Sequence, residues 1–213
     1  MKNKTQIITF SGVDGAGKTT ILREFTNILE TKYNRKVKEL RHRPSILPIL
    51  SAIKHGKNEA EKKTMDVLPR SGTNKSKLSS YVRFLYYLLD YTVGQWIVYF
   101  KYTRRGYLII YDRYYFDFIN DARRTNINLD NNFIKSFYRL VFSPEINIFL
   151  YASPEIILTR KQEMDENSII DLTEKYKILF EYYSSIGKEK YVCIENIDKE
   201  KTLSKIELIF KDF

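Results

Sequence analysis

The chain has 213 residues, of which 43% are hydrophobic and 29% are charged, so it is long enough for one globular domain with a buried core and too apolar to be disordered as a whole. The 36 Lys and Arg residues outnumber the 26 Asp and Glu residues, which gives a formal net charge of +10. This surplus favours an anionic partner, but it does not choose among nucleic acid, membrane surfaces and phosphorylated small molecules.

Strand-like and helix-like segments alternate along the chain. Strand-like runs predict strands at 6–12, 107–112, 145–152 and 190–195, and a weaker strand is predicted at 35–42. Helical periodicity predicts helices at 19–33, 78–104, 131–141, 154–165, 168–186 and 199–211. This order predicts an α/β fold, a five-stranded parallel sheet with helices on both faces, in a single domain over residues 1–213. The ligands of such sheets bind at the carboxyl ends of the strands.

The segment GVDGAGKT follows the first predicted strand, opens a predicted helix and fits the pattern G-x-x-x-x-G-K-[ST]. Glycines let backbone N–H groups approach phosphate oxygens, and the positive end of the following helix points at the same place. Lys18 adds a charge for the outer phosphates, and the Thr19 hydroxyl is a ligand for Mg²⁺. We therefore predict a three-layer P-loop NTPase fold that binds ATP. The predicted nucleotide-binding residues are Gly12, Asp14, Gly15, Ala16, Gly17, Lys18, Thr19 and Thr20.

The loop GVDGAGKTT resembles the phosphate loop of thymidylate kinases more than that of GTPases, and the sequence has no N-K-x-D guanine-reading motif. Asp112-Arg113-Tyr114, at the end of the strand 107–112, matches the D-R-[YH] signature of the same family. The chain thus resembles the thymidylate kinase-like nucleoside monophosphate kinases, as a divergent member.

The resemblance implies roles for the residues of both motifs. Asp112 would place Mg²⁺ together with Thr19, with a cap for the next element as the alternative. Arg113 would organise the phosphates between donor and acceptor. Asp14 would lie near the acceptor, with a turn residue that bonds its own backbone as the alternative.

Two segments are predicted to be mobile, the first from the resemblance to the family and the second from its composition. The segment about 158–168 looks like a short lid, which in one subclass supplies the cation that the phosphate loop lacks. Arg160 would be that cation, with Lys161 or a merely solvated helix face as alternatives. The polar stretch 52–77 has no regular pattern and predicts a mobile insert over the site, or a surface loop without a role.

The acceptor side departs from the family pattern. Thymidylate kinases carry a sequence like LLFAADR in the long helix, whose aromatic residue stacks on thymine and whose arginine reads a thymine carbonyl. Alignment on Asp90 puts Tyr87 at the aromatic place and Tyr91 at the place of the arginine, with Arg83 as a substitute cation two turns earlier. The identity of the acceptor is therefore open.

Further arginines follow the second and third strands. Arg43-Pro44 is a partial match to the Arg-Glu-Pro motif whose arginine meets the acceptor phosphate. Arg41 or Arg43 would be the phosphate clamp, and a solvated basic turn is the alternative. Arg123 and Arg124 have no counterpart in the family and suggest either an extra anionic group on the substrate or an exposed basic turn.

The resemblance implies ATP- and Mg²⁺-dependent phosphoryl transfer to a nucleoside monophosphate, most simply thymidylate. The alternatives are a kinase of another small acceptor, such as a nucleoside or a phosphorylated sugar, and an ATP-dependent nucleic-acid-binding protein, which no aromatic-basic motif supports. The expected catalytic residues are Lys18, Arg113, Arg160 and Asp14, and the expected acceptor-binding residues are Arg43, Tyr87, Asp90, Tyr91, Asp112, Arg113 and Arg124.

Partners and location follow from the remaining features. The family usually dimerises through helices on the side of the long one, so we expect a homodimer through that helix around Trp96. The apolar run 84–100 is short for a membrane span and contains Asp90, so it is interpreted as a helix buried in protein. A single cysteine, Cys193, lies in an apolar run and cannot form an internal disulfide, and the first ten residues do not resemble a signal peptide. We therefore expect a cytoplasmic protein.

Overall fold

A computed structural model describes residues 6–44, 76–121 and 126–211. Within these residues, five strands form one parallel sheet in the order β2-β3-β1-β4-β5. The strands are β1 (Ile7–Gly12), β2 (Lys36–Arg41), β3 (Tyr107–Asp112), β4 (Ile146–Tyr151) and β5 (Lys190–Glu195).

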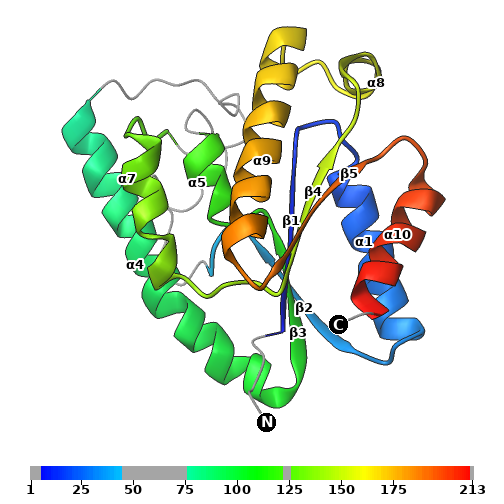
Figure 1. The fold of residues 1–213 in the computed structure, drawn as a ribbon. Helices are drawn as coiled ribbons and strands as arrows, with labels where there is room; N and C mark the ends of the chain where they lie inside the picture. Colours follow the sequence, from blue (N-terminus) through cyan, green and yellow to red (C-terminus); the bar gives the residue numbers. More distant parts are fainter. Residues whose placement is uncertain (1–5, 45–75, 122–125, 212–213) are drawn as a thin grey trace, which may run out of the picture.

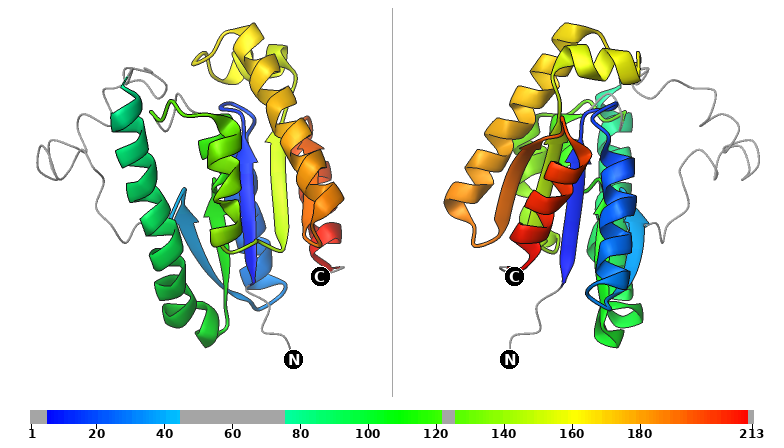
Figure 2. Two further views of the ribbon diagram at one scale, coloured as in Figure 1. Left: turned by 60° about the vertical axis from the view of Figure 1, so that its left-hand side comes forward. Right: turned by 90° about the vertical axis from the view of Figure 1, so that its right-hand side faces the viewer.

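Helices cover both faces of the sheet, as Figures 1 and 2 show. One face carries α1 (Lys18–Thr31) and α10 (Lys199–Lys211), and the other carries α4 (Lys77–Lys101) and α9 (Glu166–Ile186). The short helices are α5 (Phe116–Asn120), α7 (Asn131–Ser136) and α8 (Pro154–Arg160), and the 3-10 turns are η1 (Thr103–Arg105) and η2 (Tyr138–Leu140). The predicted three-layer α/β fold with five parallel strands is therefore confirmed.

The two cores explain why the central strands β1, β3 and β4 are largely apolar, unlike the edge strand β2. Neighbouring residues of a strand point to opposite faces, so a strand covered on both faces is apolar throughout. In β1, Ile7 packs in the core under α4 and α9, whereas Ile8 packs under α1 and α10. In β3, Ile109 and Ile110 divide between the two cores in the same way.

Several predicted helix boundaries are wrong, each for a local reason. The helix predicted at 154–165 ends at Arg160, because Lys161 is extended and the Asp165 side chain accepts a hydrogen bond from the Ser168 N–H as the cap of α9. The helix predicted at 78–104 ends at Lys101, and the turn after it closes at Gly106, whose φ is +81°. Residues 131–141 divide into α7 and η2, and α5 was not predicted.

The strands share one direction, so their carboxyl ends meet at one edge, at the top of Figure 1 beside α8. The predicted phosphate loop, the turn after β2, the start of α5 and the turn after β5 all lie at this edge. The predicted insert at 52–77 lies outside the described residues except for Ser76 and Lys77, which begin α4.

Candidate active site at the carboxyl edge of the sheet

The predicted phosphate loop joins β1 to α1 and depends on its glycines. Gly15 and Gly17 have φ values of +87° and +80°, a conformation that residues with a Cβ rarely adopt. A Cβ on Gly12 would lie 2.7 Å from the Leu150 carbonyl oxygen, so β1 approaches β4 this closely only with glycine. The loop thus has the backbone geometry that turns N–H groups toward a phosphate.

The first turn of α1 suits an anion. All of this helix is described, and its first turn contains no acidic residue, while its N-cap Gly17 has no side chain to cap the N–H groups. These N–H groups and the positive end of the helix therefore face the loop without a competing protein carboxylate in that turn. Thr19 and Thr20 lie in the same turn with exposed side chains, where the Thr19 hydroxyl is accessible to a metal-bound phosphate.

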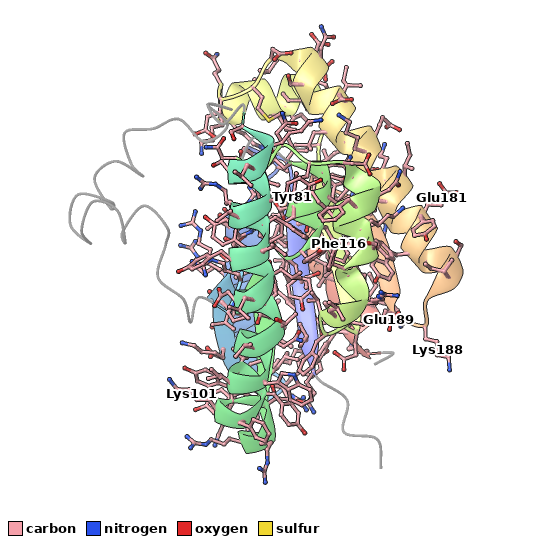
Figure 3. All side chains as sticks on the ribbon, turned by 90° about the vertical axis from the view of Figure 1, so that its left-hand side faces the viewer. Tyr81, Lys101, Phe116, Glu181, Lys188 and Glu189 are labelled. Atoms are coloured by element: carbon pink, nitrogen blue, oxygen red, sulfur yellow. The ribbon has the colours of Figure 1, made fainter. Side chains whose placement is uncertain are left out.

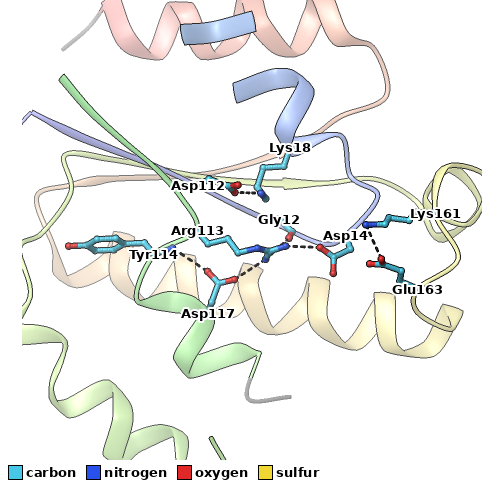
Figure 4. Close-up of polar contacts among 9 residues, drawn as sticks. All are labelled: Gly12, Asp14, Lys18, Asp112, Arg113, Tyr114, Asp117, Lys161 and Glu163. Carbon is cyan, nitrogen blue, oxygen red and sulfur yellow. Dashed lines mark hydrogen bonds and ion pairs between the residues drawn. The ribbon is translucent and has the colours of Figure 1, made fainter. Parts of the chain in front are cut away.

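Lys18 and Asp112 lie side by side and form an ion pair (Figure 4). Lys18 is nearly buried, at 8% exposure. Burial lowers the pKa of Lys18, the positive charge of Arg113 lowers it further, and Asp112 only partly offsets both. The structure therefore brings together the predicted phosphate-binding cation, at the start of α1, and the predicted Mg²⁺-binding carboxylate, at the end of β3.

Arg113 is the centre of a second buried network. Its guanidinium donates to Asp14 at 2.6 Å and to Asp117 at 2.9 Å, and to the Gly12 carbonyl at 3.3 Å, as Figure 4 shows. Burial opposes the charge of Arg113, but the carboxylates of Asp117 and Asp14 outweigh it and raise the pKa of the guanidinium. Its φ of +73° is strained for a residue with a side chain, and such strain occurs mainly at functional sites.

Asp117 is a site residue that sequence reasoning missed. It is fully buried in α5, and its second oxygen accepts from the Tyr114 N–H at 3.3 Å. Asp117 is four residues after Arg113, but helical spacing could not have predicted the contact, because Arg113 has a φ of +73° and lies before α5 begins at Phe116.

The lid segment and the turn after β5 both approach the phosphate loop. The Arg160 Nη1 atom lies 3.6 Å from the place of a Cβ on Gly17, so its guanidinium lies beside the loop. Lys161, the alternative cation, pairs with Glu163 at 2.9 Å. Asn196 donates from its side-chain amide to the Ala16 carbonyl at 2.7 Å, a contact with no signal in the sequence.

On the acceptor side, Arg43 is held by two residues of α4. Its guanidinium forms an ion pair with Asp90 and lies over the Tyr87 ring, 5.1 Å from the centroid. Arg43 and Asp90 are both buried, at 6% and 1% exposure, so the alternative of a solvated basic turn is wrong for Arg43, whereas Arg41 is exposed. The polar residue inside the apolar helix is thereby explained, because Asp90 is the partner of Arg43.

Tyr91 does not lie where a substrate would meet it. Its side chain is fully buried, and its hydroxyl donates to the His42 carbonyl. Because aromatic rings pack around it, we correct the expectation that Tyr91 contacts the acceptor. Arg123 and Arg124 lie outside the described residues.

Backbone hydrogen bonds extend the sheet into the site. The His42 N–H donates to the Asp112 carbonyl, the Arg113 N–H to the Phe10 carbonyl, and the Asn196 N–H to the Tyr151 carbonyl, each at 2.7 Å. Each bond continues the pairing of two strands by one step. The turns after β2, β3 and β5 are therefore in register with the ends of their neighbouring strands.

The donor set fits a Mg²⁺ that takes much of its coordination from a nucleotide. In the part of the chain that the structure describes, three or more His, Cys, Asp or Glu side chains never gather in a way that would hold a metal. Mg²⁺ in kinases is bound by one or two protein oxygens together with substrate phosphates and water, and Thr19 and Asp112 supply oxygens of this kind. Among the described helices, including α4, none combines the length and apolarity needed to cross a lipid bilayer.

The fold is similar to the crystal structure of thymidylate kinase from Ehrlichia chaffeensis, with a TM-score of 0.60 and 16% sequence identity over 97% of this chain and 98% of that one. No curated protein sequence matches the chain. Residues 10–207 match the thymidylate kinase family, which is nearly the whole chain. The chain therefore belongs to the thymidylate kinase family, and this membership supports a nucleotide kinase that transfers a phosphoryl group to dTMP.

Proposed function

We propose that the protein transfers the γ-phosphoryl group of ATP to thymidylate in a Mg²⁺-dependent reaction that yields dTDP and ADP. The observation that carries this proposal is the meeting of the phosphate loop, the Lys18–Asp112 pair and Arg113 at one edge of the sheet. Phosphoryl transfer needs positioning and charge neutralisation more than covalent chemistry, and these groups supply both.

The donor nucleotide is bound by the loop and α1. The loop N–H groups and Lys18 hold the β- and γ-phosphates, and Thr19 and Asp112 hold Mg²⁺, which when bound neutralises charge on the phosphates. Lys18 and Asp112 form an ion pair with each other, which limits the side-chain freedom of both groups.

Charge on the transferred group is stabilised by arginines. Arg113 keeps a fixed orientation because Asp14 and Asp117 hold it from two sides. Arg160 approaches the same loop from α8 and acts as the cation of the lid, which we place at about 158–168. Both guanidinium groups match the geometry of phosphate oxygens.

The acceptor meets the turn after β2. Arg43 binds the phosphate of the monophosphate, Tyr87 offers an aromatic face to the base, and Asp90 holds Arg43. Asp14 binds Arg113, and so lies between the donor and the acceptor ends of the site. An acceptor that is already a phosphate needs no strong general base, which agrees with a site built from arginines and a lysine.

A phosphate-transfer assay tests the proposal. Wild-type protein, ATP and MgCl₂ are incubated with each nucleoside, nucleoside monophosphate and phosphorylated sugar of a panel, and ADP formation is measured. We expect dTMP to be the best acceptor and the Lys18→Ala variant to lose about 1,000-fold in kcat. The matched control is Lys175→Ala, whose lysine is half-exposed on α9 and forms an ion pair with Asp171. Equal activity of Lys18→Ala and wild type would show that the site is assigned wrongly.

One observation favours a second acceptor class. Tyr91 is buried where the family pattern has a base-reading arginine, so the selection of thymine rests on other residues. A nucleoside or a phosphorylated sugar is the alternative acceptor. If such a compound is phosphorylated faster than dTMP in the same panel, the acceptor is wrong and the kinase assignment stands.

We also propose that the protein is cytoplasmic and that it forms a homodimer through α4. This helix, which lies in front in Figure 3, has a stripe of large apolar side chains that are at least 41% exposed and mostly spaced by three or four residues. The stripe consists of Leu78, Val82, Leu85, Leu89, Val93, Trp96, Ile97 and Phe100. Sedimentation velocity tests the dimer, which Leu89→Asp should convert to a monomer. A monomeric wild type at micromolar concentration would contradict it.

A further inference from the structure

The turn after β2 has a strained backbone that must be fixed by its surroundings. His42 has a φ of +65°, in the left-handed region that a residue with a side chain rarely adopts. The next residue closes a tight turn, because the Arg43 N–H donates to the Arg41 carbonyl at 2.7 Å. The direction in which Arg43 leaves the sheet is therefore set by the conformation of His42.

Contacts with Asp112, Phe118 and Tyr91, within the described residues, hold His42 in this conformation. Its N–H donates to the Asp112 carbonyl at 2.7 Å, which ties it to the end of β3. Its ring packs against Phe118 with centroids 5.2 Å apart. Its carbonyl accepts a hydrogen bond from the hydroxyl of Tyr91, so α4 also contacts the backbone of this turn.

The ring of Tyr91 belongs to the hydrophobic core, whereas its hydroxyl forms a hydrogen bond with the backbone of this turn. The ring makes edge contacts with Tyr114, Tyr115 and Phe118 at centroid distances of 5.4 to 5.6 Å, which a phenylalanine would keep. Burial raises the pKa of Tyr91 well above its ordinary value, so the hydroxyl stays protonated and remains a donor. A fully buried hydroxyl without a partner is costly, and the His42 carbonyl meets this need.

One face of α4 therefore controls the whole turn. Tyr87, Asp90 and Tyr91 are three and four residues apart, so they point to the same side of the helix. Tyr87 and Asp90 hold the guanidinium of Arg43, and Tyr91 holds the backbone from which it projects. A guanidinium has five N–H donors in a fixed fork, so it can bridge a carboxylate and a phosphate when its base is held still.

We propose that Tyr91 is a positioning residue for the acceptor, and that its hydroxyl acts through the His42 carbonyl to hold Arg43 against an anionic group of the acceptor. The proposal rests on the proposed function for the identity of that group as a phosphate. Tyr91, which stands where the family pattern has an arginine that reads the base, would therefore help to place the phosphate instead.

Steady-state kinetics of two Tyr→Phe variants test the proposal. We expect Tyr91→Phe to raise the KM for dTMP about five- to tenfold, with the KM for ATP unchanged within about twofold. Tyr115→Phe is the matched control, because Tyr115 is equally buried and also donates to a backbone carbonyl, that of Ile134, at 2.7 Å. Equal KM values for dTMP in the two variants would overturn the proposal, as would an equal rise in the KM for both substrates of Tyr91→Phe.

A double-mutant cycle tests whether Tyr91 acts through Arg43. Arg43→Lys keeps a cation beside Asp90 but loses the fork, so it should fold and should raise the KM for dTMP about tenfold or more. In that background, Tyr91→Phe should add less than about a twofold rise. If the two effects multiply, Tyr91 acts by another route.

Hydrogen exchange separates this proposal from the proposed function, because it requires no substrate. In Tyr91→Phe, the amides of His42 and Arg43 should exchange at least about tenfold faster than in wild type, while Tyr115→Phe should leave them unchanged. Unchanged exchange in Tyr91→Phe would refute the positioning role even in an active kinase. Faster exchange in a protein that phosphorylates no nucleotide would keep the positioning role and reject the proposed function.

Discussion

The phosphate loop is held mainly by backbone geometry, whereas the turn with Arg43 is held by side chains of a neighbouring helix. On the donor side, two glycines with positive φ and a close approach of Gly12 to β4 fix the path of the chain. On the acceptor side, Asp90, Tyr87 and Tyr91 of α4 hold the turn. A site fixed by backbone geometry leaves a motif in the sequence, and a site fixed by distant side chains does not.

The largest effect that this comparison predicts is at Gly17. A Cβ there would lie 2.5 Å from the Asn196 amide nitrogen, at a φ that already disfavours alanine. Gly17→Ala should therefore lower kcat/KM for ATP about 100-fold, because a displacement of about 1 Å misaligns the reacting groups. Gly106→Ala is the control, since Gly106 has a φ of +81° and no atom within 4 Å of an added Cβ. If both variants keep the wild-type kcat/KM, the donor loop does not depend on its backbone.

The next largest effect concerns the network around Arg113. Asp117→Asn should lower the free energy of unfolding by about 2–3 kcal/mol, because it weakens a fully buried ion pair. Asp14→Asn should cost about 1 kcal/mol, since the Asp14 side chain is 13% exposed and water can partly replace the contact. Urea unfolding of both variants measures the difference, and an equal loss would contradict the assigned roles of the two carboxylates.

A smaller effect is expected at Tyr87, on the acceptor side. Tyr87→Leu removes the aromatic face that lies under Arg43, whereas Tyr87→Phe keeps it. The KM for the acceptor should rise about three- to fivefold in the first variant and less than about twofold in the second. A similar KM in both variants would mean that the ring does not contribute to the placement of Arg43.

The smallest effect is expected at Cys193, which belongs to neither half of the site. Burial raises the pKa of this thiol to about 11, so at pH 8 the reactive thiolate should be about 100-fold scarcer than in a thiol of pKa 9. Iodoacetamide should therefore modify the folded protein much more slowly than glutathione, and activity should persist. Rapid alkylation of the native chain would contradict this environment, and the unfolded chain in urea provides the fast reference.

The sequence was sufficient for the fold and for the donor side, for physical reasons. Doubly covered strands are apolar throughout, and the loop glycines and Lys18 are adjacent in the chain, so local patterns predict them. Asp117 and Asn196 were missed because their partners, Arg113 and the Ala16 carbonyl, become neighbours only after folding. Tyr91 was misassigned because helical spacing predicts on which face of the helix a residue lies. It does not predict whether a turn from elsewhere in the chain, here the turn after β2, covers that face.

The backbone bonds that continue the sheet past its strands have a consequence for how the protein tolerates change. His42, Arg113 and Asn196 are each aligned with a neighbouring strand through main-chain atoms that every amino acid except proline provides. Replacement of their side chains should alter chemistry while leaving the spacing between donor and acceptor ends intact. Side chains at these three positions can therefore change without disturbing the main-chain frame that sets the distance between the two ends of the site.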